Sequence, residues 1–162
     1  MRPLLTALLC AALTGGMAHA TEAPTPLAVW QTDPGQVFTS ADVDLTDFLW
    51  LARPIVVFAD TPNDPRFQTQ MELLESRLPE LIDRDVLIIT DTDPSAANAL
   101  RTKLRPRGFM VALIGKDGGV KLRKPFPWDV REFSRSIDKM PMRQQELRDA
   151  KNLGSMQSGV TE

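Results

Sequence analysis

The stretch PIVVFA at residues 54–59 is a continuous apolar run rich in β-branched side chains. Such a run predicts a strand that is buried on both faces, in a sheet that helices cover on both sides. Two further runs of this kind follow along the chain, DVLIIT at residues 85–90 and FMVALI at residues 109–114. We therefore expect these three segments to be the central strands of one α/β domain.

The segments between these runs carry the signals of helices. Asp64-Pro65 places a capping residue before a proline at the first helical position, and residues 67–78 then repeat apolar side chains at helical spacing. Asp93-Pro94 repeats the same signal before the apolar positions of residues 97–104. Strands that alternate with helices in this way indicate crossover connections between parallel strands.

The part of the chain after residue 114 predicts a hairpin and a last helix. Residues 116–119 read Lys-Asp-Gly-Gly, a tight turn, and the basic residues 120–123 then return as a short edge strand. Residues 130–140 have the apolar spacing of an amphipathic helix. The resulting order, β-α-β-α-β-β-α, is that of the thioredoxin core. We therefore predict a thioredoxin-like three-layer α/β fold with a mixed four-stranded sheet.

The N-terminus has the features of a secretory signal peptide. An arginine at position 2 precedes the apolar stretch Leu4–Leu13, and Ala18-His19-Ala20 fits the small-residue rule for cleavage. We expect cleavage after Ala20 and a periplasmic or secreted protein without a stable membrane anchor. The predicted organisation is a signal peptide at 1–20, an irregular N-terminal arm at 21–44, a thioredoxin-like domain at 45–140, and a C-terminal helix with a disordered tail at 141–162, the disorder starting near Gly154.

Removal of residues 1–20 would leave a chain without several reactive side chains. The single cysteine, Cys10, and the single histidine, His19, both lie in that segment, and the sequence has no tyrosine. A zinc site of cysteine and histidine ligands and catalysis by a histidine base are therefore excluded for residues 21–162. The formal net charge of −2 shows no electrostatic signature of nucleic-acid binding. We predict no cofactor, no metal and no catalytic residue.

Several short motifs resemble a known family. They are Val57–Asp60, Asp64–Phe67, Leu113–Lys121 and Ile137–Arg143. Together they resemble domain-of-unknown-function family 4174, a thioredoxin-like, peroxiredoxin-like domain of exported bacterial proteins that is similar to a domain of vertebrate sushi-repeat-containing extracellular proteins. The resemblance covers roughly residues 45–145. It implies the fold and carries no established activity.

The comparison with active thioredoxins concerns the start of the first helix after the strand at 54–59. Their Cys-Gly-Pro-Cys motif falls, in a gapless alignment, on Asn63–Arg66, which keeps the proline and has no sulfur. A thiolate at a helix N-terminus is what these enzymes use, and none can form at this position. Met110 occupies the place of their cis-proline, and Pro106 lies nearby but is offset.

The same helix end is the predicted binding site. Its first amide groups lack intrahelical partners, and Arg66 lies in its first turn, so an anion is a suitable ligand there. We expect Arg105 and Arg107 to approach the same end of the sheet and to complete, with Asn63, Asp64 and Arg66, a site for a carboxylate or phosphate. The alternative is an ordinary helix whose amides are occupied by the carboxylate of Asp64.

The sequence therefore favours a binding or interaction module. Its expected partner is an envelope or extracellular protein of unknown identity, or a small anion. The alternative is an enzyme with a thiol-independent mechanism at the carboxyl ends of the strands, in which Asp60 or Asp85 acts as acid or base. A separate group of oxygen ligands that follow strand ends suggests calcium, although their spacing matches no EF-hand loop; it comprises Asp60, Asn63, Asp64, Asp91 and Asp93.

Overall fold

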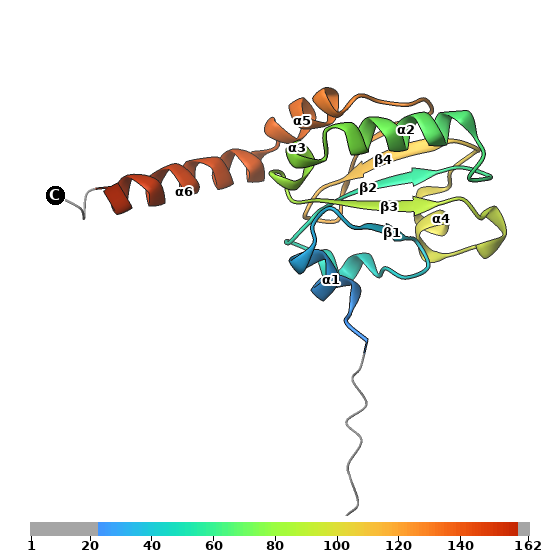
Figure 1. Cartoon of the computed structure of the whole chain (residues 1–162), viewed down its shortest axis with the longest axis horizontal. Helices are drawn as coiled ribbons and strands as arrows, with labels where there is room; N and C mark the ends of the chain where they lie inside the picture. The colour runs from blue at the N-terminus through green and yellow to red at the C-terminus, as the bar shows by residue number, and fades with distance from the viewer. Residues whose placement is uncertain (1–22, 159–162) are drawn as a thin grey trace, which may run out of the picture.

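The computed structural model describes residues 23–158, so the predicted signal peptide lies outside the described residues. In chain order the elements are α1 (Pro26–Thr32), β1 (Val37–Thr39), the 3₁₀ helix η1 (Leu45–Phe48), β2 (Arg53–Phe58), α2 (Pro65–Ser76), α3 (Leu78–Ile82), β3 (Val86–Asp91), η2 (Pro94–Ala96), α4 (Ala99–Leu104), β4 (Met110–Ile114), β5 (Val120–Lys124), α5 (Val130–Asp138) and α6 (Pro141–Ser158). Figure 1 shows one sheet with helices on both sides, as the three-layer prediction requires.

The described sheet has five strands in the order β1-β3-β2-β4-β5. β3 pairs in parallel with both β1 and β2, whereas β4 pairs antiparallel with β2, and β5 antiparallel with β4. The prediction of four strands is corrected by β1, which spans only Val37–Thr39. Three residues are too few to show the alternation by which a strand is found in a sequence.

The connection from β3 to β4 also differs from the expected parallel crossover. Phe58 at the end of β2 lies opposite Met110 at the start of β4. The strand β4 therefore begins where the parallel strands β2 and β3 have their carboxyl ends, and it runs in the opposite direction. The helix in this connection is short: the six residues of α4 span about 9 Å, less than half of the roughly 20 Å of a six-residue strand.

The predicted irregular arm at 21–44 is corrected by a helix, α1, and a strand, β1, within its described residues 23–44. α1 begins after Thr25, whose side chain accepts a hydrogen bond of 3.2 Å from the amide of Ala28, with Pro26 at the first helical position. Trp30 of α1 is buried and meets the ring of Phe48 edge-on, with 6.1 Å between centroids. The arm is therefore part of the core.

The core consists of two clusters, one on each face of the sheet. Val56 and Phe58 point to the face that α1, η1 and α4 cover, where Leu104 is also buried. Ile55 and Val57 point to the opposite face, which α2, α3 and α5 cover. All six residues of β2 are buried, which confirms the prediction of a strand covered on both sides.

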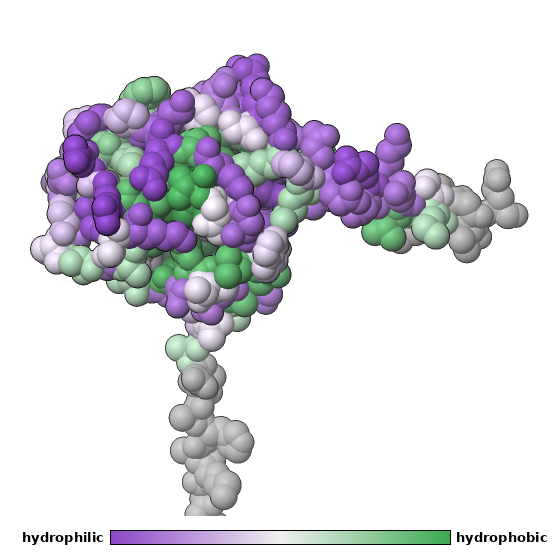
Figure 2. Space-filling view, turned by 180° about the vertical axis from the view of Figure 1, so that it is seen from behind, coloured by the Kyte–Doolittle hydropathy of each residue, from purple (hydrophilic) through white to green (hydrophobic). Residues whose placement is uncertain are grey.

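The helix α6 extends away from the body of the domain (Figure 1). It continues to Ser158, so the disorder expected from Gly154 onward is not what the structure shows for residues 154–158. Beyond its first turns the helix has few contacts, and Leu153 and Met156 are 63% and 70% exposed. Figure 2 shows a largely hydrophilic projection with apolar atoms near its far end.

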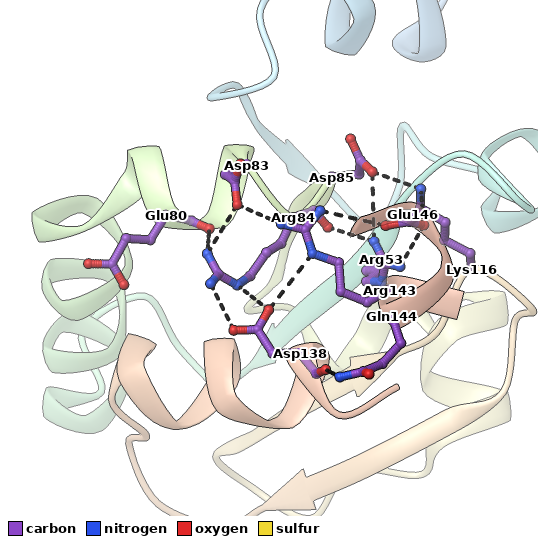
Figure 3. A network of polar contacts seen from close by, with 10 residues as sticks. All are labelled: Arg53, Glu80, Asp83, Arg84, Asp85, Lys116, Asp138, Arg143, Gln144 and Glu146. Carbon is purple, nitrogen blue, oxygen red and sulfur yellow. Dashed lines mark hydrogen bonds and ion pairs between the residues drawn. The ribbon is translucent and has the colours of Figure 1, made fainter. Parts of the chain in front are cut away.

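A network of charged side chains attaches the base of α6 to the domain (Figure 3). The Arg53 guanidinium, only 1% exposed, donates a hydrogen bond of 2.8 Å to Oε1 of Glu146, and Lys116 Nζ lies 2.9 Å from the same oxygen. Arg143, also on α6, contacts Asp83 at 2.6 Å. The helix is therefore anchored by ion pairs at the end of the sheet opposite the predicted site.

Candidate functional site

The N-terminus of α2 is occupied by its own capping residue. Oδ1 of Asp64 accepts a hydrogen bond of 2.9 Å from the amide of Arg66, and the Arg66 guanidinium donates to both carboxylate oxygens at 3.1 and 2.8 Å. The hydrogen bond from this guanidinium lowers the pKa of the Asp64 carboxyl below its usual value. Asn63 is exposed beside this pair. The helix end therefore has the capped geometry that was the alternative to an anion site.

Arg66 connects this helix end to the rest of the predicted site through an aromatic ring. Its guanidinium carbon lies 5.4 Å from the centroid of Phe109, within the range of a cation–π contact. The same phenylalanine lines a hollow together with Arg105 and Arg107. The structure thus groups Arg105 and Arg107 on one side of Phe109, and leaves the Asp64–Arg66 pair as a neighbour outside that hollow.

This hollow, which we call the basic groove, has a volume of about 220 Å³. It is lined by Arg105, Arg107, Phe109, Met110, Arg123, Lys124 and Pro125. Its four cationic side chains form no ion pair with any carboxylate among residues 23–158, whereas Arg66 and Arg101 next to it are paired. The sequence indicates Arg123 only as part of a basic edge strand at 120–123 and predicts no role for Lys124. The groove brings them together with the two predicted arginines.

The backbone around the groove is held in a defined shape. Arg105 ends α4 in the left-handed conformation, with φ of 49°, and its amide donates to the carbonyl of Arg101 at 2.8 Å. Gly108 turns the chain toward β4 with φ of 67°, a value that favours glycine. Lys124 lines the groove, and its Nζ lies 4.9 Å from the centroid of the Trp128 ring, which lies outside the lining of the groove. The groove is therefore built on fixed backbone.

A second polar cluster lies at the carboxyl ends of β2 and β3 around Asp91, which the sequence suggests only as a calcium ligand. Asp91, 4% exposed, accepts hydrogen bonds from Ser40 Oγ at 2.7 Å, from Asn98 Nδ2 at 2.6 Å and from Arg101 Nε at 2.7 Å. Arg101 also donates to the carbonyl of Ala59 at 2.8 Å. These contacts tie the ends of the two strands to α4.

The electrostatics of Asp91 argue against a role as a general base. Burial raises the pKa of its carboxyl, but the hydrogen bonds from Asn98, Ser40 and Arg101 outweigh burial and hold the pKa below the usual value. An acid with a lowered pKa is a weak base, and its oxygens are already engaged. Asp91, which the sequence suggests only as a calcium ligand, thus has its carboxylate oxygens engaged by contacts within the protein.

The position of the thioredoxin cysteines is held by exposed Asn63 and by Arg66, and the cis-proline place is held by Met110, which lines the basic groove. Within residues 23–158 no peptide bond is cis, so Pro106 follows a trans bond. In the same residues no three acidic, histidine or cysteine side chains gather where they could hold a metal. No helix in this part of the chain is both long and apolar enough to span a membrane.

The fold and this set of residues define a thioredoxin-like, peroxiredoxin-like domain. The family described as "Domain of unknown function (DUF4174)" matches residues 44–146, and the chain belongs to this family. Among solved structures it is similar to the reduced 2-Cys peroxiredoxin of Plasmodium vivax, with 14% identity, a TM-score of 0.51, and coverage of 66% of this chain and 90% of that one.

The chain is also similar to thioredoxin peroxidase I of Plasmodium yoelii, with 17% identity, a TM-score of 0.46, and coverage of 64% of this chain and 80% of the other. At such identities the peroxiredoxin structures show the fold alone. A comparison with curated proteins finds no match.

Proposed function

We propose that this protein is an exported binding module without thiol redox activity, and that it holds an anionic group of its partner in the basic groove. The observation that carries the proposal is the concentration of four cations, Arg105, Arg107, Arg123 and Lys124, around one hollow without a carboxylate partner among the described residues. Like charges held close together repel each other, and a bound anion relieves that repulsion.

The chemistry of the groove suits a carboxylate or a phosphate. Arginine presents a planar fork of donors that matches the oxygens of either group, and three of the four cations are arginines. The volume of about 220 Å³ accommodates a group several times larger than a water molecule, whose share of liquid volume is about 30 Å³. Phe109 and Met110 add an apolar side to the groove, which is typical of ligand sites.

In this proposal the protein has no thiol redox activity because its exported part has no cysteine sulfur. Disulfide exchange and peroxide reduction by this fold require a thiolate, and residues 21–162 contain no cysteine. Asn63 and Arg66 hold the positions at the start of α2 where a thiolate would lie. An enzyme at the strand ends has less support, because Asp85, one of its two candidate carboxylates, lies before β3 and pairs with Lys116 at 2.7 Å.

Export is a separate part of the proposal and has its own test. It rests on the signal-like features of residues 1–20. Intact mass measured on the protein recovered from the envelope fraction or the medium of its native cells should correspond to a chain that begins at Thr21. A chain that retains Cys10 would contradict export with cleavage after Ala20, and would bring the thiol back into consideration.

Binding in the groove is tested by calorimetric titration with pyrophosphate and with citrate at low ionic strength. We expect saturable binding of at least one of them, and a Kd that rises at least about tenfold in the double variant Arg107→Glu, Lys124→Glu. The matched control is Arg148→Glu, Lys151→Glu, which changes the net charge equally but lies on α6. No binding of either anion, or equal weakening by both variants, would contradict the proposal.

A further inference from the structure

The strand β5 is an edge of the described sheet and has an open side. It follows β4 in the strand order and has no further neighbour. Apart from the ladder with β4, no backbone hydrogen bond among residues 23–158 involves the backbone of Val120–Lys124. An open edge of this kind is a template for pairing with another extended segment.

The side chains of β5 divide between the two faces of the sheet. A bulge between Leu113 and Ile114 shifts the register, so Val120 packs with the core cluster on the α4 face and Leu122 with the cluster on the α5 face. After Leu122 the alternation continues. Arg123 reaches the carbonyl of Leu104 on the α4 face, and Lys124 lies over Trp128 on the α5 face.

Each face has a hollow beside β5, and both hollows are cationic. The basic groove lies at the end of β5, where Arg123 turns toward the α4 face while its fourth cation, Lys124, also reaches the α5 face. On the α5 face lies a shallow, open hollow of about 540 Å³, whose lining includes Lys121, Lys124 and Lys139. In that second hollow Lys121 is paired with Asp117, while Lys124 and Lys139 have no carboxylate partner among the described residues.

We propose that β5 binds an extended acidic peptide segment of a partner protein, which adds as a sixth strand to the sheet. A strand added to this edge sends its side chains alternately to the two faces. Acidic side chains at odd and at even positions of the added strand would therefore both reach cations. Those on one face would reach the basic groove, and those on the other face would lie beside Lys124 and Lys139. The backbone supplies affinity through hydrogen bonds, and the two hollows supply the preference for acidic side chains.

Charge also argues for this occupant over a second copy of the chain. If two copies paired through β5, the strands Val120–Lys124, each carrying Lys121, Arg123 and Lys124, would lie side by side. Like charges across a strand pair are destabilising. An acidic segment would instead place negative charges beside the positive side chains of β5, and this pairing is attractive.

The proposal rests on the proposed function, because it names the partner of the basic groove, and one set of titrations separates the two. The probe is an octapeptide of alternating glutamate and threonine, titrated into the purified protein beside pyrophosphate and citrate. A second peptide has the same sequence and charge, but its central amide nitrogens are methylated and cannot donate hydrogen bonds. Hydrogen exchange of the backbone amides of residues 120–124 is followed by NMR in both titrations.

We expect the unmodified peptide to bind, to slow exchange within residues 120–124 at least about tenfold, and to bind at least about tenfold more tightly than the methylated peptide. Equal binding of both peptides would overturn strand addition and leave the groove as a site for charge alone. If pyrophosphate or citrate binds and neither peptide binds, the peptide partner is overturned and the proposed function still holds. If neither the peptides nor the anions bind, both proposals fail.

Discussion

The guanidinium of Arg123 on β5 donates a hydrogen bond of 3.0 Å from Nη1 to the carbonyl oxygen of Leu104, the last residue of α4. This contact joins the two sides of the basic groove across 19 residues of sequence. It also satisfies one of the carbonyl groups that the end of a helix leaves without a partner. The spacing of the four cations in the groove therefore depends on Arg123 in two ways, through its own charge and through this attachment.

We expect Arg123→Ala to lower the free energy of unfolding by about 1 kcal/mol, because one hydrogen bond to a helix-terminal carbonyl is lost. Chemical denaturation monitored by tryptophan fluorescence measures it. Arg131→Ala is the matched control, since the Arg131 side chain is exposed and makes no hydrogen bond or ion pair with the described residues. It should change stability by less than about 0.5 kcal/mol. Equal effects of the two variants would show that the Arg123 contact is not stabilising.

We expect Glu146→Gln to destabilise the protein by about 2 kcal/mol at pH 7. The substitution leaves the buried Arg53 guanidinium without its anionic partner on α6, and partial exposure of Glu146 keeps the loss below that of a fully buried pair. Hydrogen exchange should accelerate in residues 141–150. The control is Glu132→Gln, whose pair with Arg135 is exposed, with an expected loss below about 0.5 kcal/mol. Unchanged exchange in α6 would contradict the anchoring role.

Acidification should destabilise the protein below about pH 4.5. Burial raises the pKa of Glu146, but hydrogen bonds and charges from Arg53 and Lys116 outweigh it and hold the pKa below the ordinary value of 4.5. In this window the unfolded state binds more protons, so the stabilisation is complete above the ordinary pKa and is lost as the pH falls through the folded pKa.

Unfolding free energies measured between pH 7 and pH 3 should therefore fall less steeply in Glu146→Gln than in the unsubstituted protein. Asp91 follows the same sign, since its pKa is also lowered, so some acid dependence should remain in that variant. If the unfolding free energy falls equally steeply with pH in both proteins, Glu146 does not contribute to the acid dependence.

The strands and caps of the fold were predictable because their signals are local. The apolar run at 54–59 and the Asp64-Pro65 pair each specify one element through its own residues, and both are where they were expected. Thr25-Pro26 is the same kind of signal and begins α1. The prolines around it, Pro24 and Pro34, nevertheless favour an irregular arm in the sequence, so the local signal is masked by its surroundings.

The basic groove could be predicted only in part. Arg105 and Arg107 were placed at the correct end of the sheet, because they precede a strand whose neighbours were identified. Arg123 and Lys124 come from the returning strand of a hairpin, and their distance from α4 depends on a register with a bulge that the sequence does not show. The contacts of Asp91 with Ser40 likewise join residues 51 positions apart, and no local pattern predicts them.

We expect the purified protein to show no turnover in insulin reduction by dithiothreitol or in peroxide consumption, at rates above those of buffer alone. Both reactions need a thiolate, and no cysteine follows residue 20. Cys10→Ser in the full chain is the control for any uncleaved protein. A rate that persists in the Cys10→Ser protein and scales with its concentration would contradict a module without redox activity.

The central claim is that the basic groove binds an anionic group, and an NMR titration of the isotope-labelled protein with pyrophosphate tests it most directly. We predict saturating shifts concentrated in the amides of residues 104–105, 107–109 and 121–124, with a Kd that rises as salt is added because exposed charges are screened. Arg107→Glu, Lys124→Glu should abolish these shifts, and Arg148→Glu, Lys151→Glu should preserve them. Shifts confined to the start of α2, shifts scattered over the surface, or no saturation would contradict the claim.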